Sequence, residues 1–452
     1  MKVLIGLIIY GNHVMRSLNL KPTWQNFLRM SEQIKTINVE KKRFGYINFV
    51  EENIMREWEN ADIKFDVCLK NIEDSNLFLR KFYEELSKHG KIGWSFQSYR
   101  EDTVIRVGDT NYGEMWIEYK QKGKICKIYF QTSSKEVHNR VEAALKSAKE
   151  KHDVMKHYTV TVSFIDEDIK FCDMCRNGIE ITSTERENKI LTRVTFPVKA
   201  FGQYDLQYVV TQKINYLQHL LCAYTNIIFS LDKISCDEGI YNIRDNVWQE
   251  PNQNWITTDD QFINIDKQIL SLSSDFFSVF RKVVDKSEYN REIRLLLNAS
   301  QEIFCSKKMI SNFFKAGSEW NIPGYTDLIN TLIISALEPL SNIFGVKSEK
   351  CSVCGSLKYS VRKKVRDLCN AYFPEQLAKE IYDKGYHNRS AFLHEGYPVT
   401  NEFYCGHCVP LINPVDGRSV LFPGAYIDLN LFEYVTFIFR KTTSDVLKEF
   451  ND

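Results

Sequence analysis

Hydrophobic residues alternate with polar ones in several segments of the first half of the chain. The run Thr159-Val160-Thr161-Val162-Ser163-Phe164 has a period of two, and residues 125–131 and 191–198 are rich in β-branched and aromatic side chains. Both patterns predict β-strands. Helical spacing intervenes at residues 76–89, 136–152 and 205–226. We therefore expect a mixed α+β arrangement with a large antiparallel sheet.

The second half changes to helical periodicity. After a polar stretch at 241–260 that we interpret as a connector, hydrophobic residues recur at three- and four-residue spacing in six segments: 265–284, 289–305, 325–344, 361–372, 374–394 and 429–450. Pro374 suits a first helical turn, and Gly396 suits a helix terminator. The predicted fold is α+β: a β-rich domain at 1–240, the connector, and an all-α domain at 261–452.

Composition indicates a soluble globular protein without settling its partners. The 452 residues are 44% hydrophobic and 26% charged, and the net charge is +1, so a nucleic-acid partner would have to bind a local patch. The apolar run at residues 3–9 is too short to cross a bilayer, and we interpret it as a buried strand. No longer apolar stretch follows, so we expect a cytoplasmic protein without a membrane partner.

Four cysteines have the spacing of a metal site. Cys351 and Cys354 form one Cys-x-x-Cys pair, and Cys405 and Cys408 form another. Four thiolates complete one tetrahedral zinc shell, and an outgoing and a returning helix between the pairs would bring them together. We predict a closed structural Zn²⁺ clamp over residues 351–408, with binding energy of roughly 10–16 kcal/mol. The alternative is four unrelated buried thiols.

A third pair, Cys172 and Cys175, carries a weaker signal. No second pair lies near it in the sequence, and no thioredoxin-like strand–helix context surrounds it. Two ordinary cysteines at a turn explain this pair better than a redox or metal role.

The segment between the two predicted zinc pairs ends in residues suited to cleaving RNA. Histidine titrates near neutrality and can move protons, whereas arginine offers a planar fork of donors to phosphate oxygens. Arg389 and His394 lie five residues apart, about 140° around a regular helix. One copy would therefore splay them, unless the helix ends early at Gly396 or two copies pair and pool their residues. Ser390 shares the helix face of His394 and could orient its ring. A histidine that merely complements the helix dipole is the alternative.

Arg389, His394 and the following Glu-Gly resemble the HEPN family of helical-bundle ribonucleases and nucleotide-binding modules, in the Apea-type form found in bacterial anti-phage defence. The run Ser335-Ala336-Leu337-Glu338-Pro339-Leu340 resembles an earlier helix of such proteins. The resemblance covers residues 260–452. It implies that Arg389 and His394 are the catalytic pair and that the active species is a homodimer or higher oligomer. Ser390 departs from the Asn, Asp or His common at that position.

Local charge favours a polyanionic partner. Residues 351–394 hold eight lysines and arginines against four acids, a net charge of +4. Arg362, Lys363 and Arg366 would fall on one side of a helix, where they could contact RNA phosphates. A solvated helix face explains them equally well.

The leading hypothesis is a metal-independent, toxin-like endoribonuclease that leaves 2′,3′-cyclic phosphate ends, with a phage-derived trigger bound by the first domain. Glu338 is a weaker candidate member of its site. Two alternatives stay open. One is a non-catalytic helical module that binds nucleotide, RNA or protein, and the other is an adaptor stabilised by zinc.

Overall fold

The computed structural model describes most of the chain from residue 57 onward. The described residues are 57–90, 92, 94–95, 99–101, 103–120, 124–150, 155–166, 170–186, 189–239, 255–257, 269–285, 290–316, 325–344, 361–390, 392–393, 411–412, 420–421 and 429–449. The predicted strand at residues 3–9 lies outside them.

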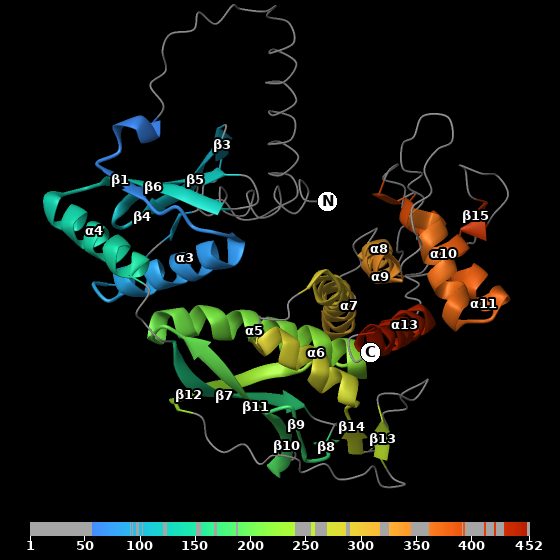
Figure 1. Cartoon of the computed structure of the whole chain (residues 1–452). Coiled ribbons are helices and arrows are strands. Elements are labelled where there is room, and N and C mark those ends of the chain that lie inside the picture. Colours follow the sequence, from blue (N-terminus) through green and yellow to red (C-terminus); the bar gives the residue numbers. More distant parts are fainter. Residues whose placement is uncertain are drawn as a thin grey trace, which may run out of the picture.

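The first part, residues 57–150, is a six-stranded antiparallel sheet with two helices, and we call it the N-terminal unit (Figure 1). Its strand order is β1-β6-β5-β4-β2, and β3 pairs with β4. Asn71 and Ser134 accept hydrogen bonds from the first-turn amides of the two helices and so fix where those helices begin. The elements are η1 Glu57–Asn60, β1 Ile63–Asp66, α3 Ile72–Ser87, β2 Trp94–Ser95, β3 Tyr99–Glu101, β4 Val104–Thr110, β5 Gly113–Lys120, β6 Lys124–Thr132 and α4 Lys135–Lys149.

A second antiparallel sheet follows, in the order β12-β7-β11-β10-β9. Val160, Val162 and Phe164 of β7 are fully buried beneath the helices, as their period of two requires. Its strands are β7 Lys156–Asp166, β9 Met174–Arg176, β10 Ile179–Arg186, β11 Lys189–Ala200 and β12 Ser230–Glu238, and the helix α5 Gln203–Thr225 lies between β11 and β12 in the chain. A small parallel sheet joins β13 Trp255–Thr257, β14 Ile269–Ser271 and β8 Lys170–Phe171.

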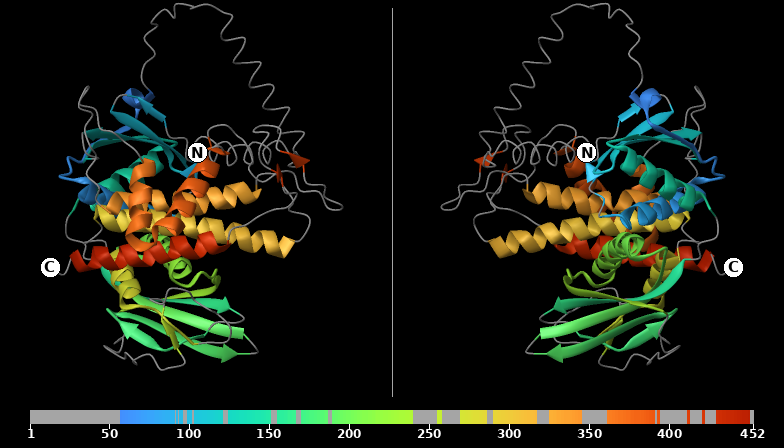
Figure 2. Two further views of the ribbon diagram at one scale, coloured as in Figure 1. Left: turned by 90° about the vertical axis from the view of Figure 1, so that its right-hand side faces the viewer. Right: turned by 90° about the vertical axis from the view of Figure 1, so that its left-hand side faces the viewer.

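The remaining chain is mainly helical (Figure 2). The helices are α6 Ser274–Asp285, α7 Arg291–Ala316, α8 Tyr325–Ser335, α9 Leu337–Ile343, α10 Val361–Tyr372, α11 Glu375–Lys379, the π-helical turn η4 Glu380–Gly385, α12 Tyr386–Ser390 and α13 Leu429–Glu449. A two-stranded ribbon pairs β15 Leu411–Ile412 with β16 Val420–Leu421.

Besides a small cluster of Trp58, Ala61, Val104, Trp116 and Tyr129, two large hydrophobic cores hold the described elements together. One lies in the N-terminal unit and runs from Ile63 to Ala148. The other runs from Tyr158 to Leu447 and includes both the second sheet and the helices that follow it. The second sheet and the helical region therefore bury their hydrophobic side chains in one common core. The domain limits at 240 and 261 stay a prediction.

The mixed α+β class, β-rich first and helical later, is confirmed. The segment predicted as a helix at 265–284 is different, because Ile269–Ser271 is a strand of the small parallel sheet and the helix begins only at Ser274. The predicted single helix at 325–344 is two helices that meet at Ala336. The segment 374–394 is also interrupted, by η4.

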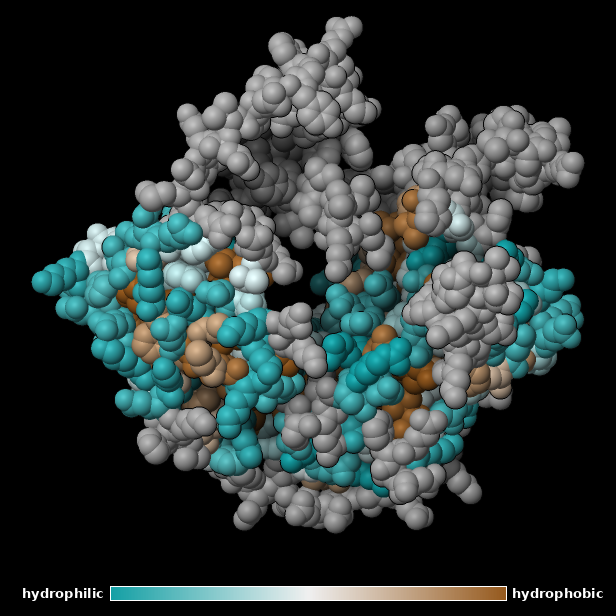
Figure 3. All heavy atoms as spheres, turned by 45° about the horizontal axis from the view of Figure 1, so that its top comes forward, coloured by the Kyte–Doolittle hydropathy of each residue, from teal (hydrophilic) through white to brown (hydrophobic). Residues whose placement is uncertain are grey.

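The face shown in Figure 3 is mostly hydrophilic where its residues are described, with scattered hydrophobic patches. In this view the N-terminal unit and the end of the helical region that carries α10 form two lobes beside a hollow. No helix of the described residues is long and apolar enough to cross a membrane.

Candidate functional site

Arg389 lies near the end of α12, which begins directly after the π-helical turn η4. Turns with i→i+5 hydrogen bonds are rare and often lie at functional sites. Here the turn packs tightly on α8: a Cβ built on Gly385 would lie only 2.4 Å from Cδ1 of Ile334. Glycine at this position lets the turn approach α8 closely, and the close approach places α12 beside the junction of α8 and α9.

The Arg389 guanidinium is held by three side chains from this junction and from its own helix. Its Nε donates to Oγ of Ser335 at 2.9 Å, and its Nη2 lies 2.8 Å from Oε1 of Glu338. Its Cζ lies over the Tyr386 ring, 5.2 Å from the ring centre. Only 14% of the Arg389 side chain is exposed, against 31% for Glu338. The guanidinium charge is therefore largely removed from solvent, and the orientation of the guanidinium group is fixed.

Tyr386 connects to the same carboxylate. Its hydroxyl donates to Oε1 of Glu338 at 2.6 Å, so this oxygen binds both the arginine and the tyrosine. Burial raises the pKa of Tyr386 and the bond to Glu338 raises it further, so the phenol stays protonated and acts as a donor. Tyr386 is not among the site residues predicted from the sequence; its spacing of three from Arg389 on a helix is the signal that could have found it.

Glu302 of α7 is a second carboxyl in the electrostatic environment of this cluster. Burial raises its pKa, Arg389 opposes that shift, and Glu338 adds to it. We refer to Glu302, Ser335, Glu338, Tyr386 and Arg389 together as the Arg389 cluster. Four elements, α7, α8, α9 and α12, contribute to it. Nothing in the sequence near Glu302 marked it, because only the fold brings α7 to this place.

Of the other two predicted catalytic residues, the structure describes only Ser390. Ser390 is exposed at the end of α12. His394 lies outside the described residues. Phe392 and Leu393, just before it, are again π-helical, so the end of this segment is not the regular helix that the angle between Arg389 and His394 assumed.

The three predicted RNA-binding residues lie on α10 and are all exposed. Arg362 is already paired, since its Nη2 lies 2.7 Å from Oδ1 of Asp383 in η4. Arg366 lies 3.7 Å from Asp367. The positive charge of this surface is thus partly offset by acids of the same chain, which sequence order alone does not reveal.

The predicted zinc ligands Cys351, Cys354, Cys405 and Cys408 lie outside the described residues. Within the described ranges, no group of three or more His, Cys, Asp or Glu could hold a metal ion. Cys172 lies just before β9 and Cys175 within it; both are buried, and burial raises the pKa of Cys172. The sequence predicts two ordinary cysteines at a turn; their burial suits ordinary cysteines, but Cys175 lies in a strand.

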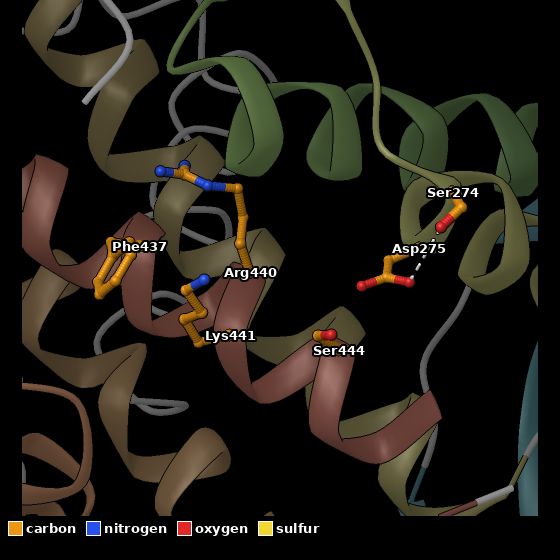
Figure 4. A pocket seen from close by; sticks show the side chains of 6 residues that line it. All are labelled: Ser274, Asp275, Phe437, Arg440, Lys441 and Ser444. Atoms are coloured by element: carbon orange, nitrogen blue, oxygen red, sulfur yellow. Dashed lines mark hydrogen bonds between the residues drawn. The ribbon is translucent and has the colours of Figure 1, made fainter. Parts of the chain in front are cut away.

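A separate pocket opens between α6 and α13 (Figure 4). It measures about 330 Å³ and is lined by Ser274, Asp275, Phe437, Arg440, Lys441 and Ser444. Figure 4 shows the side chain of Arg440 extending away from Asp275. The lining mixes both signs of charge and includes no residue of the Arg389 cluster. Comparison with protein-family models, with curated proteins and with solved structures found no match.

Proposed function

We propose that this protein is a metal-independent endoribonuclease of the HEPN type. The observation that supports the proposal is the Arg389 cluster: a guanidinium, mostly buried, held in one direction by Ser335, Glu338 and Tyr386. A fixed arginine costs little reorganisation when charge develops on a phosphate. The contacts to Ser335 and Glu338 use two of its five N–H donors, which leaves a fork able to bind phosphate oxygens.

The winding of the helix that carries Arg389 affects how this residue can act together with the proposed general base, His394. On a regular α-helix, residues five apart are separated by about 140°. In a turn with i→i+5 hydrogen bonds, residues five apart are separated by a smaller angle than on a regular α-helix. Phe392 and Leu393 are π-helical. We propose that a single copy contributes both Arg389 and His394, or that two copies pool them in a homodimer.

The proposed reaction needs only groups from the chain. His394 takes the proton of the ribose 2′-hydroxyl, and the 2′-oxygen attacks the adjacent phosphorus. Arg389 offsets the charge on the phosphorane, and the protonated His394 passes its proton to the 5′-oxygen as the bond from phosphorus to that oxygen breaks. The products are a 2′,3′-cyclic phosphate and a 5′-hydroxyl. Zinc held by Cys351, Cys354, Cys405 and Cys408 would fold the surrounding segment and stay outside the chemistry.

The biological role in this proposal is that of a toxin-like effector of anti-phage defence in the cytoplasm. RNA is the substrate, and the N-terminal region binds a phage-derived trigger. A second candidate is a non-catalytic module that binds nucleotide, RNA or protein. One observation favours it: Arg389 is already neutralised by Glu338, as a purely structural arginine would be.

Cleavage of a labelled single-stranded RNA in the presence of EDTA tests the proposal. We expect His394→Ala and Arg389→Ala each to lower the rate by about 10²–10⁴-fold. Arg140→Ala is the matched control, because Arg140 is a partly exposed arginine of α4 that pairs with Glu136. Cleavage at the wild-type rate by the His394 or Arg389 variant would assign the activity elsewhere. RNA binding without any cleavage by the wild type would favour the binding module.

A further inference from the structure

The N-terminal unit has its own hydrophobic core, and it meets the rest of the protein where α3 lies against α5 (Figure 1). Three charged side chains at this contact are almost removed from solvent. Arg80 is 12% exposed, Glu84 5% and Asp205 1%. Buried charges are costly unless they are paired, so this contact has one well-defined geometry.

Arg80 and Asp205 form a two-point ion pair across the contact. Nε of Arg80 donates to Oδ1 of Asp205 at 2.7 Å, and Nη2 donates to Oδ2 at 2.7 Å. Nη2 also donates to the carbonyl of Lys199 at 3.3 Å, and the guanidinium lies 5.8 Å from the centre of the Phe201 ring. A planar arginine fork fixes orientation as well as distance. One residue of α3 is therefore locked to the junction of β11 and α5.

Glu84 of α3 supplies the N-terminal cap that α5 lacks. Gly202 stands at the cap position without a side chain, and the Asp205 amide donates to Oε2 of Glu84 at 2.8 Å. A carboxylate here also complements the positive end of the helix dipole. Gly202 has an extended backbone, so any residue could adopt its φ, but a Cβ there would lie 2.0 Å from Oε1 of Glu84. A side chain at position 202 would therefore displace the Glu84 carboxylate from the start of α5.

From this contact α5 runs to three elements of the larger core. Its buried Lys213 donates to the carbonyl oxygens of Val283 and Val284 at the end of α6, at 2.8 and 2.5 Å. The ring of His219 lies 4.8 Å from that of Phe304 in α7, the helix that carries Glu302. At its end, Asn226 donates to Glu433 of α13. One helix thus touches both the N-terminal unit and α7, the helix that carries Glu302.

We propose that Arg80, Glu84 and Asp205 form a coupling joint through which the N-terminal unit controls the Arg389 cluster. A ligand that shifts this unit would change the cap on α5, and α5 would transmit the change through His219 and Phe304 to α7. By linkage, substrate at the cluster would in turn stabilise one position of the N-terminal unit. This inference rests on the proposed function only for its effect on RNA cleavage; the mechanical coupling stands on the contacts alone.

Hydrogen exchange followed by mass spectrometry on the full chain tests the joint. The variant is Glu84→Gln, with Gly202→Ala as a second, and the control is Glu136→Gln, which removes an exposed carboxylate of α4. We expect faster exchange in the first turn of α5 and, at a distance, a change of at least about threefold in α7 and in residues 386–390. The control should leave all three regions unchanged.

RNA cleavage by the same variants distinguishes mechanical coupling through α5 from control of the Arg389 cluster. Changed exchange in α7 together with an altered cleavage rate supports control of the cluster. Changed exchange confined to α3 and α5, with wild-type cleavage, overturns it. If the wild-type chain cleaves no RNA, the proposed function fails, and exchange in α7 alone decides whether the joint transmits. Should Gly202→Ala fail to fold, Glu84→Gln keeps the size of the side chain and decides alone.

Discussion

Nη2 of Arg389 lies 2.8 Å from Oε1 of Glu338, and that same oxygen accepts the hydroxyl of Tyr386 at 2.6 Å. One carboxylate therefore orients both the guanidinium and the phenol. The residues come from α9 and α12, which are separated by about 50 positions in the chain. The arrangement means that Glu338 affects any property that depends on the direction of Arg389.

A double-mutant cycle measures this dependence. Glu338→Gln leaves Arg389 mostly buried beside a neutral amide, so we expect a loss of about 1–3 kcal/mol in the free energy of unfolding. Arg389→Ala should cost a similar amount, and the double variant should cost clearly less than the sum, because the second change removes a charge that is already unpaired. Urea titration gives all four values. Additive losses would show that the two side chains act independently.

The raised pKa of Glu302 predicts that the free energy of unfolding depends on pH. Burial raises its pKa in the folded protein, partly opposed by Arg389 and reinforced by Glu338. Between the unfolded pKa and the raised folded value, the native state binds more protons, so stability falls as pH rises through that window. Glu302→Gln should remove this fall and gain stability relative to the wild type from pH 4.5 toward neutrality. Thermal melts across that range test it, with Glu136→Gln as control; a constant difference between Glu302→Gln and wild type would contradict it.

Local patterns predicted most elements of the fold. The alternation in β7 and the spacing in α5, α10 and α13 were strong enough to place these elements to within a few residues. The failure at Ile269–Ser271 has a clear cause: this strand pairs in parallel with β8, almost 100 positions earlier, and a short apolar run does not distinguish a buried strand from a helix. Tertiary pairing decided the conformation.

The candidate site was only partly predictable for a related reason. The sequence identified Arg389 and weakly Glu338, because a family resemblance marked both. It could not identify Glu302 or the bond from Tyr386, since these depend on how α7, α8 and α9 pack around α12. The π-helical turn at Glu380–Gly385 was also missed, because nothing in hydrophobic periodicity distinguishes one inserted residue from a regular helix.

His219 predicts a loss of stability in acid. Burial lowers its pKa to about 4, and Lys308 adds to the shift. Its Nδ1 has no hydrogen-bond partner within the described ranges. The unfolded chain binds a proton near pH 6.5 and the folded one does not, so stability decreases as pH falls from 6.5 through about 4, by at most about 1.4 kcal/mol per pH unit. His219→Phe should flatten this part of the profile, whereas His138→Phe on α4 should not. Parallel profiles would contradict the assignment.

Asp383 predicts a gain in RNA affinity when its charge is removed. Its carboxylate lies 2.7 Å from Nη2 of Arg362, and the pair is well exposed. Asp383→Asn would release this arginine for phosphate contact and remove a repulsive charge, so we expect binding of single-stranded RNA to strengthen several-fold. The slope of log affinity against log salt should steepen by up to about 0.7. Asp285→Asn on α6, whose carboxylate lies 2.7 Å from Nε of Arg281, is the control. Unchanged affinity in both variants would place RNA away from α10.

The four cysteines of the proposed clamp predict about one zinc ion per chain. Cys351→Ser should abolish binding, because three thiolates and a hydroxyl make a far weaker shell than four thiolates. The same variant should lower the melting temperature. Cys236→Ser, which changes an exposed cysteine of β12, is the matched control and should retain the metal. Elemental analysis of the purified proteins measures the ratio directly.

Because the proposed chemistry uses no metal, a brief EDTA treatment that leaves this zinc in place should not slow RNA cleavage. Cleavage lost at once in EDTA, with zinc still bound and the fold intact, would point to a second metal in the reaction itself.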